Sequence, residues 1–221
     1  PSSVDRYAFS HAVYLESVLT GMAAGIRARM HKTAYDVLKD EGDHVGVMVQ
    51  RSMHALNASP LVPPVVVVDE LRQAAAVATT YLAFETAEDL LRKALEQAKA
   101  TMVADDTLDA ADPRDADSRS RGSRYGDGGW VPGGADLGRT IFRRFEPISD
   151  QVLARLHLEL GSAINLVGDV REAKTLLSEC AELAEELGDA DLFAAAALEY
   201  GGPIPAGHEE SDPRAIQLLR E

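Results

Sequence analysis

The six histidines are the side chains best suited to metal binding or acid–base chemistry, yet their spacing favours neither. They are His11, His31, His44, His54, His157 and His208. A helical metal site needs ligands three or four residues apart, so that they share one face, and a carboxylate beside them. No two of these histidines have that spacing. The sequence therefore predicts no metal site and no bound cofactor.

The nucleophiles and phosphate-binding motifs of common enzymes are also missing. No serine lies in a Gly-x-Ser-x-Gly turn, and no Gly-x-x-x-x-Gly-Lys-Ser/Thr loop is present to hold a nucleotide phosphate. Cys180, the only cysteine, falls on an apolar helical stripe, where we expect a buried small hydrophobic side chain rather than a reactive thiol. One cysteine cannot form an internal disulfide, which favours a cytoplasmic location.

Carboxylates are abundant but follow a helical period. Glu179, Glu182, Glu185 and Glu186 stand between apolar residues, which is typical of a solvated helix face rather than a catalytic pair. We therefore predict that the chain is not an enzyme. An enzymatic alternative would require a polar pocket with convergent histidines or carboxylates beneath residues 103–147.

Two amphipathic helices organise the C-terminal half of the chain. Between Leu156 and Glu186, apolar residues recur at steps of three and four on both sides of the dipeptide Gly168-Asp169. Glycine readily takes the left-handed conformation that ends a helix, and Asp169 can cap the next helix with Glu172 three positions later. The pattern predicts a helical hairpin that needs a similar neighbour to bury its apolar stripes.

Small and large residues in this hairpin fall at the positions typical of the 34-residue tetratricopeptide repeat, which the segment resembles. The small residues are Gly161, Ala173 and Cys180, and the large ones are Ile164 and Leu177. The pattern is incomplete, because His157 replaces a large aromatic residue and Glu185 replaces the usual proline. A generic amphipathic hairpin is the alternative.

A second hairpin is predicted upstream, from helices at residues 64–82 and 84–102. Its residues Ala75, Ala87, Leu91 and Ala94 match the repeat positions of Gly161, Ala173, Leu177 and Cys180. The fold class is therefore all-α, with antiparallel hairpins stacked as a right-handed, tetratricopeptide-like solenoid and a long flexible insertion. The scarcity of aromatic residues, 5% of the chain, also favours close helix packing over a β-sandwich.

The remaining segments complete four predicted regions. Residues 1–59 contain three predicted helices, of which one begins near Ser10 and the others cover 27–39 and 45–56. The apolar stripe of the second helix begins just before its predicted start and comprises Ile26, Met30, Ala34, Val37 and Leu38. Residues 60–102 form the first hairpin, and 103–147 form an acidic, Gly-rich insertion too polar to fold alone. Residues 148–221 hold the second hairpin, followed by capping helices at 189–200 and 212–220.

The end of the insertion combines aromatic and basic side chains. We expect a candidate docking tail there, comprising Trp130, Phe142, Arg143, Arg144 and Phe145. Three interpretations remain open for this tail: it packs back on the repeats, covers a groove as an internal lid, or presents a docking patch to a partner. Trp130 is either an interface anchor or a loop residue folded onto the nearest helix.

Charge and hydropathy exclude two classes of partner. The formal net charge of -14 disfavours direct contact with nucleic acid, because phosphate binding requires clustered lysine and arginine. No run approaches the ~20 apolar residues of a membrane helix, and no signal peptide is evident. The chain starts with Pro1 rather than methionine, so we expect a piece of a larger protein.

Three phrases carry a second resemblance: FSHAVYLESVLTGMAAGIRARMHKTAYDVL, VQRSMHALNAS and ALEYGGPIPAG. Their content and order are similar to those of bacterial signal-transduction ATPases, in particular large ATP-binding LuxR-type transcriptional regulators and antibiotic regulatory proteins. In that family an ATPase module is followed by tetratricopeptide-like repeats. The resemblance implies a non-catalytic arm that senses an effector or binds a protein, either a separate partner or the parent's own ATPase module. A small-molecule effector and homo-oligomers are further possibilities.

In the repeat pattern, the first helix of each hairpin lines a concave groove. The candidate groove residues are Asp69, Arg72, Thr79, Thr80, Arg155, Ser162 and Asn165, together with Ala76, Leu158 and Leu166. Arg72, Arg155 and Asn165 are the donors suited to a peptide carboxylate or an acidic helix. The alternative is that these are ordinary surface residues. The alternative function is a free-standing adaptor that binds a peptide or partner protein.

Overall fold

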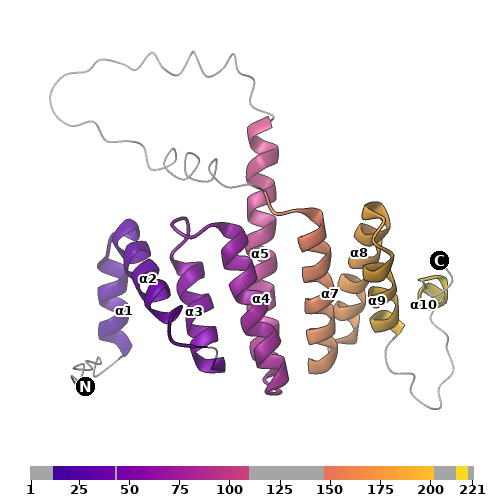
Figure 1. The fold of residues 1–221 in the computed structure, drawn as a ribbon, viewed down its shortest axis with the longest axis horizontal. Helices are drawn as coiled ribbons and strands as arrows, with labels where there is room; N and C mark the ends of the chain where they lie inside the picture. Colours follow the sequence, from indigo (N-terminus) through magenta and orange to yellow (C-terminus); the bar gives the residue numbers. More distant parts are fainter. Residues whose placement is uncertain (1–11, 43, 110–146, 202–212, 219–221) are drawn as a thin grey trace.

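The computed structural model describes residues 12–42, 44–109, 147–201 and 213–218, and within these ranges every regular element is a helix (Figure 1). The all-α class is therefore confirmed for this part of the chain. The helices are α1 (Ala12–Gly21), α2 (Ala24–Leu38), α3 (Val45–Asn57), α4 (Pro64–Thr80), α5 (Phe84–Asp109), α7 (Asp150–Val167), α8 (Val170–Leu187), α9 (Ala190–Gly201) and α10 (Pro213–Leu218).

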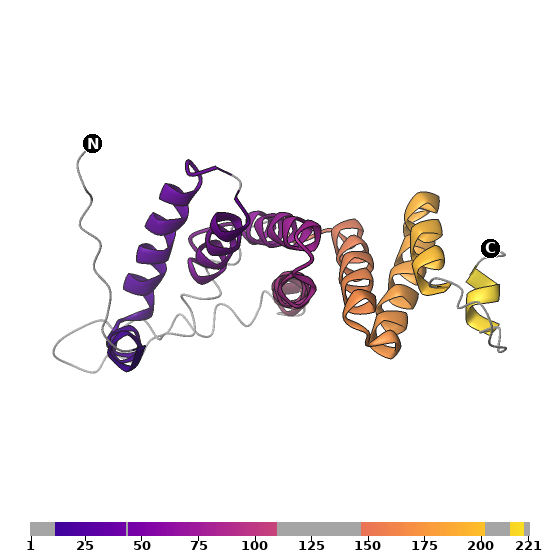
Figure 2. The ribbon, with the colours of Figure 1, turned by 90° about the horizontal axis from the view of Figure 1, so that it is seen from below.

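The helices form hairpins that follow one another in a row (Figures 1 and 2). α4 packs on α5, α5 on α7, α7 on α8, and α8 on α9. One hydrophobic cluster runs through this row from Tyr35 on α2 to Leu176 on α8, and a second joins α7, α8, α9 and α10. Stacking of hairpins is the arrangement that the sequence predicts, whereas the handedness of a superhelix stays a prediction.

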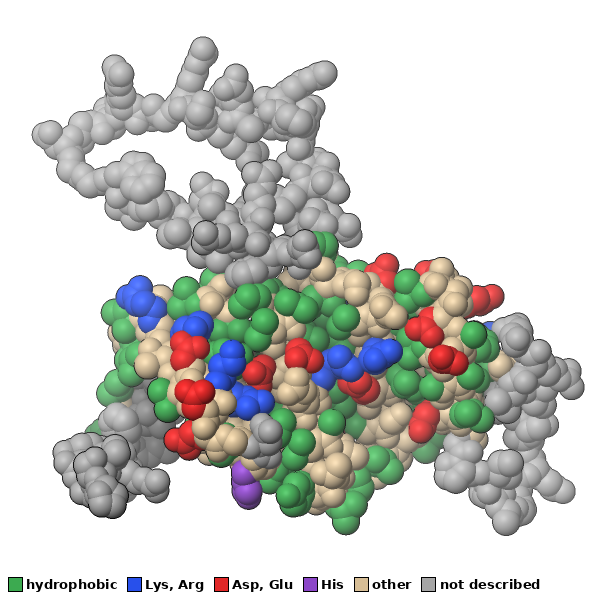
Figure 3. Space-filling model, in the orientation of Figure 1, with side chains coloured by type: hydrophobic (Ala, Val, Ile, Leu, Met, Phe, Trp, Pro, Cys, Tyr) green, Lys and Arg blue, Asp and Glu red, His purple; other side chains and the backbone are tan. Residues whose placement is uncertain are grey.

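Acidic side chains dominate the end of the row formed by α8 and α9 (Figure 3). Between residues 169 and 201 the sequence has nine Asp or Glu and two Lys or Arg, which gives a net charge of 2 − 9 = −7. Half of the chain's formal charge of -14 is therefore concentrated in this short segment. Such a surface repels phosphate groups and suits basic partners.

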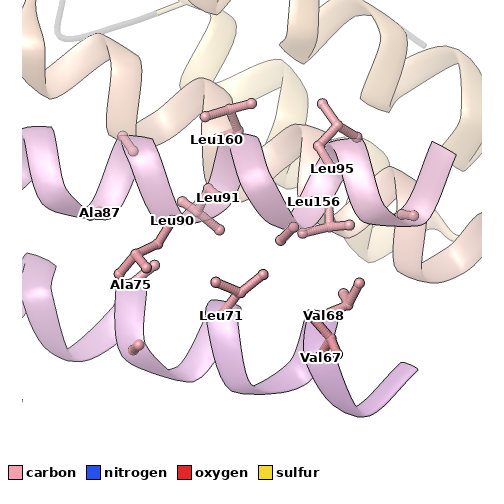
Figure 4. Close-up of a cluster of buried hydrophobic side chains, with 14 of the residues drawn as sticks. Val67, Val68, Leu71, Ala75, Ala87, Leu90, Leu91, Leu95, Leu156 and Leu160 are labelled. Atoms are coloured by element: carbon pink, nitrogen blue, oxygen red, sulfur yellow. The ribbon is translucent and has the colours of Figure 1, made fainter. Parts of the chain in front are cut away.

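The core of the first hairpin lies between α4 and α5 and extends to α7 (Figure 4). Val67, Val68, Leu71 and Ala75 lie on the side of α4 that faces α5, where Leu90 is beside Ala75, and Leu160 of α7 lies beyond α5. Leu71, Leu90, Leu156 and Leu160 are all at most 1% exposed. Full burial of each contributes roughly 1.5–3 kcal/mol, so α5 joins the two hairpins by sharing its side chains with both.

Every repeat-like position that the sequence identified lies in the interior. Ala75, Ala87, Leu91, Ala94, Ile164, Ala173, Leu177 and Cys180 are buried, as is Gly161. At Gly161 the reason is steric. A Cβ atom there would stand 2.8 Å from Cγ of Leu177 and 3.4 Å from the carbonyl oxygen of Ala173. The crossing of α7 over α8 therefore depends on a residue without a side chain.

The turn between α7 and α8 confirms the predicted cap. Gly168 has a φ of 110°, in the left-handed region, and the Asp169 side chain accepts a hydrogen bond of 3.2 Å from the Glu172 N–H. The next turn repeats the device with Gly188, at a φ of 68°, and Asp189, which accepts from the Leu192 N–H at 3.0 Å. The turn between α4 and α5 differs, because Leu82 occupies the left-handed position with a φ of 59°.

The apolar residues predicted to form one stripe on α2 lie mostly outward. Ile26, Met30 and Val37 are 47%, 56% and 57% exposed, while Tyr35 and Ala28 are buried. The inward face is set by the Tyr35 ring, whose hydroxyl donates to a buried carboxylate on α4. Helical periodicity identifies the stripe but does not say which face is covered.

The predicted end of α5 differs from the structure, and several other expectations fall on residues that the structure does not describe. α5 continues past Met102 to Asp109, so the first residues of the predicted insertion are helical. The expectations for Ser10, for the rest of the insertion, and for the segments 202–212 and 219–221 fall outside the described residues.

Replacing Leu82 by glycine is expected to raise the free energy of unfolding by about 1 kcal/mol, because a left-handed conformation costs a residue with a Cβ atom roughly 1–2 kcal/mol. Urea unfolding monitored by circular dichroism measures the change. The matched control is Leu198→Gly, at an exposed position inside α9, which should lower stability by about 1 kcal/mol. Equal losses in both variants would contradict the strain at Leu82.

Replacing Gly161 by alanine is expected to lower stability by about 1–2 kcal/mol, although alanine is the better helix former, because the added methyl group overlaps Leu177. Gly25, exposed on α2, provides the control, because a Cβ atom added there would meet no other atom within 4 Å. Gly25→Ala should be neutral or stabilising by up to about 1 kcal/mol. The steric explanation fails if Gly161→Ala also stabilises the protein.

Candidate functional site

The candidate groove residues lie on the first helix of each hairpin. Asp69, Arg72, Thr79 and Thr80 belong to α4, and Arg155, Ser162 and Asn165 belong to α7. Of these, Asp69, Thr80 and Arg155 are exposed and the others are partly buried. The structure therefore keeps the predicted set at or near the surface, and their hydrogen-bond partners decide which ones are available to a ligand.

Arg72 already has an internal partner. Its Nε donates to Oε2 of Glu159 on α7 at 2.8 Å, and its Nη2 donates to the other carboxylate oxygen. This two-point hydrogen bond raises the pKa of Arg72 above its ordinary value. The guanidinium thus fixes α4 against α7, and its predicted role in contacting a partner's carboxylate would require breaking this pair.

Several other candidates bond within or between the helices. Asn165 Nδ2 approaches the carbonyl oxygen of Glu199 on α9 at 3.4 Å, and Asp69 accepts from Gln73 at 2.7 Å. The hydroxyls of Thr79 and Thr80 donate to backbone carbonyls of their own helix. Arg155 differs, because it is exposed and its side chain forms no hydrogen bond or ion pair with any described residue.

We define the first-helix face as a set of exposed residues on α4, α7 and α9. They are Asp69, Ala76, Thr80, Arg155, Leu166, Asp191, Ala194 and Leu198. Leu166 and Leu198 are 54% and 69% exposed, although each lies on a helix whose other residues fill the core. The face therefore combines an available cation with aliphatic side chains on helices whose opposite sides pack in the hydrophobic clusters.

A buried polar network connects α2 and α3 to α4. Arg51 Nε donates to Glu70 Oε2 at 2.6 Å, and the Tyr35 hydroxyl donates to Glu70 Oε1 at 3.0 Å. Arg51 and Glu70 are only 7% and 9% exposed. Burial, followed by the hydrogen bond to Glu70, raises the pKa of Tyr35 to about 12. The three residues are distant in sequence, so no local pattern could have predicted the network.

A second cross-link joins α5 to α8. Arg92 donates to both oxygens of Glu172, at 2.6 and 2.7 Å, and also to Glu88 on its own helix at 2.9 Å. The hydrogen bond from Arg92 lowers the pKa of Glu172. Glu172 was identified from sequence as part of a cap, and its backbone N–H does serve there, but its carboxylate stabilises the contact between hairpins.

His31 and His54 meet across α2 and α3, although no sequence spacing indicated a pair. Their Nδ1 atoms are 2.9 Å apart and their ring centroids 5.1 Å apart. These two distances place each Nδ1 atom near the line that joins the ring centroids. The arrangement suits one N–H···N hydrogen bond between the rings, rather than two lone pairs that converge on a metal ion. Burial is the main cause that lowers both pKa values. No cluster of three or more metal-ligating side chains occurs among the described residues.

His157 is buried in the core of the second hairpin without a hydrogen bond. It is 4% exposed, neither ring nitrogen has a partner among the described residues, and its Nε2 is 3.6 Å from Oε2 of Glu179. Burial, with a smaller contribution from Lys99, lowers the pKa of His157 to about 4. The imidazole is therefore neutral at pH 7 and positioned as a core side chain.

An open hollow of about 370 Å³ lies beside α8. It is lined by Lys174, Thr175, Ser178, Glu179, Glu182 and Tyr200. The Ser178 hydroxyl is 3.4 Å from Glu182 and 3.5 Å from the Arg214 guanidinium of α10, so its described partners are a carboxylate and a cation. Cys180 is fully buried nearby in sequence, and burial raises its pKa to about 11. This thiol stays protonated at neutral pH, as the sequence interpretation of a small buried hydrophobe requires.

The candidate docking tail, Trp130, Phe142, Arg143, Arg144 and Phe145, lies outside the described residues. Within the described residues, no helix has the length and apolar character required to cross a membrane. Comparison with known proteins found no matching family model, no matching curated protein and no matching solved structure. The function is accordingly inferred from the residues and contacts described above.

Acidification is expected to lower the free energy of unfolding through His157, and replacing His157 by leucine should remove this contribution. The pKa of His157 is about 4 when folded and 6.5 when unfolded, so the unfolded chain binds the proton first as the pH falls below 6.5. Its contribution to the free energy of unfolding should decline by about 2 kcal/mol between pH 7.5 and pH 5. Urea unfolding of both proteins at the two pH values measures the difference, and an equal decline in the variant would contradict the assignment.

Proposed function

We propose that this chain is a non-catalytic arm of a bacterial ATP-dependent transcriptional regulator that binds a protein partner or an effector through its first-helix face. The observation that carries the proposal is the exposed, unengaged Arg155 on a helix whose neighbours are cross-linked. The order of motifs, which resembles that of large ATP-binding LuxR-type regulators, supports the assignment to a regulator. The partner is a separate protein or the parent's own ATPase module.

The chemistry of the face suits a peptide with aliphatic side chains and a carboxylate opposite Arg155, while Asp69 and Asp191 of the same face favour basic groups in the rest of the peptide. Arg155 can donate two parallel hydrogen bonds to a carboxylate, which a lysine in the same place could not do. Leu166 on α7 and Leu198 on α9 present aliphatic surface that a partner can remove from water. Arginine beside apolar contacts is a common composition at the centre of protein interfaces.

Hydrogen bonds between the helices that carry the face restrain their relative positions. Arg72 and Glu159 hold α4 against α7, and Asn165 reaches the backbone of α9. A surface that is already ordered loses less conformational entropy on binding, which favours affinity. The partly buried Arg72 pair therefore supports a binding role indirectly, by fixing the distance between the helices that carry the face.

The state of the reactive side chains is compatible with a non-catalytic arm. At neutral pH, His157 is a neutral core side chain and Cys180 is a buried thiol, while Ser178 is associated with Glu182 and Arg214. His157 and Cys180 are buried without an accessible base, and the Ser178 hydroxyl has only a long contact of 3.4 Å with Glu182 and lies beside the Arg214 guanidinium, so no catalytic role is assigned to the three side chains. Cys180 belongs to the second hydrophobic cluster, His157 is a buried side chain of α7, and Ser178 lies on the α8 surface.

Peptides that bind the whole chain can be selected from a displayed random library, and their binding is expected to depend on Arg155. Binding of the selected peptides, measured by fluorescence anisotropy, should weaken at least tenfold in Arg155→Glu, because a favourable ion pair becomes a repulsion. The control is Arg171→Glu, the same change at an exposed position on α8 away from the face. Binding that is insensitive to Arg155→Glu, or equally sensitive to Arg171→Glu, would overturn this choice of surface.

A further inference from the structure

α2 carries an aliphatic stripe that no described residue covers. Ile26, Met30 and Val37 are about half exposed, and Thr33 continues the line between them. On the opposite side of the helix, Tyr35 is 2% exposed and belongs to the main hydrophobic cluster. The helix is thus apolar on two faces, of which only one is used by the fold.

The spacing of the stripe is that of a helix-pairing seam. Positions 26, 30, 33 and 37 advance by four, three and four residues, which keeps them within a narrow band on an α-helix. The band spans about 17 Å at a rise of 1.5 Å per residue, or most of this 15-residue helix. Aliphatic residues repeated in this manner are normally covered by a second helix rather than by water.

One flank of the stripe changes sign along the helix. Arg29 lies on this flank in the first half of the helix, Lys32 lies near its middle, and Asp36 lies on the same flank in its second half. Lys32 Nζ contacts Asp36 at 2.6 Å within the helix, while the exposed side chain of Arg29 forms no hydrogen bond or ion pair with a described residue. A partner helix that fits this flank must be acidic opposite Arg29 and basic opposite Asp36.

A second copy of α2 in the antiparallel direction meets that requirement. In a two-fold symmetric pair, residue i of one helix faces residue j of the other, and j faces i. With the axis near positions 32 and 33, Arg29 and Asp36 are each about one helical turn from the centre on opposite sides. Arg29 of each copy then faces Asp36 of the other, and the aliphatic stripes lie against one another.

We propose that the α2 stripe is a self-association surface, on which α2 of a second copy of this chain packs antiparallel about a two-fold axis. The contact of two short helices is smaller than a standard interface of about 1,600 Å², so the dimer is weak and forms in the micromolar range. This surface is separate from the first-helix face, so either assignment can fail without the other.

Sedimentation equilibrium of the whole chain, from about 1 to about 500 μM, tests the proposal. The chain is expected to dimerise reversibly, and Met30→Glu should abolish the dimer by placing two charges in the seam. Val170→Glu, at an aliphatic residue of similar exposure at the start of α8, is the control and should leave dimerisation unchanged. Circular dichroism verifies that each variant is folded. A monomer across the whole range, or a dimer indifferent to Met30→Glu, overturns the proposal.

Charge swaps identify the partner as a second copy. Arg29→Asp and Asp36→Arg should each weaken dimerisation at least tenfold, because both place like charges opposite one another. An equimolar mixture of the two variants should recover the dimer, since the introduced aspartate of one copy would then face the introduced arginine of the other. If Met30→Glu abolishes association but the mixture does not recover it, the stripe binds a different surface, and the antiparallel pairing is wrong.

Discussion

The close approach of helices through small residues is the constraint on which the rest of this structure depends. Gly161 allows α7 to cross α8 at a distance that even one methyl group would prevent, and fully buried alanines at positions 87, 94 and 173 serve the adjoining contacts. Close approach lets the large side chains interdigitate, so Leu71, Leu90 and Leu156 are removed almost completely from water. The alanine-rich, aromatic-poor composition is therefore a consequence of hairpin stacking.

Arginine–glutamate pairs add orientation to this packing. Arg51 pairs with Glu70 between α3 and α4, Arg72 with Glu159 between α4 and α7, and Arg92 with Glu172 between α5 and α8. The net free energy of such pairs is small when they are exposed, and the buried Arg51 pair must also offset the desolvation of both charges. Their fork geometry nevertheless specifies the angle and register of each contact, which apolar side chains alone leave loosely defined.

Local sequence patterns predicted the helices and turns, but they could not predict contacts between residues that are far apart in the sequence. Helical periodicity located the hairpins, the Gly168-Asp169 turn and the buried repeat-like residues, because these depend on neighbours within a few positions. The pairing of Arg72 with Glu159, 87 residues away, and of His31 with His54 depends on the final packing. Leu82 occupies a cap where glycine would be expected, so the sequence predicted the α4–α5 turn but extended the first helix to residue 82, two residues past its end at Thr80. For the candidate site, sequence identified the helices but not which donors remain available.

Two features of the chain reduce its stability or its solubility, and they differ in what they imply. His157 is a polar side chain inside the core without a hydrogen bond, and this lowers the stability of the folded chain without creating any accessible surface. The stripe of Ile26, Met30 and Val37 has the opposite character, because exposed aliphatic residues cost the folded chain little but lower its solubility. A buried defect can persist wherever the surrounding core is stable enough to tolerate it. An aliphatic stripe whose charged flank changes sign along the helix gains free energy when another helix covers it, so it is the stripe that points to association.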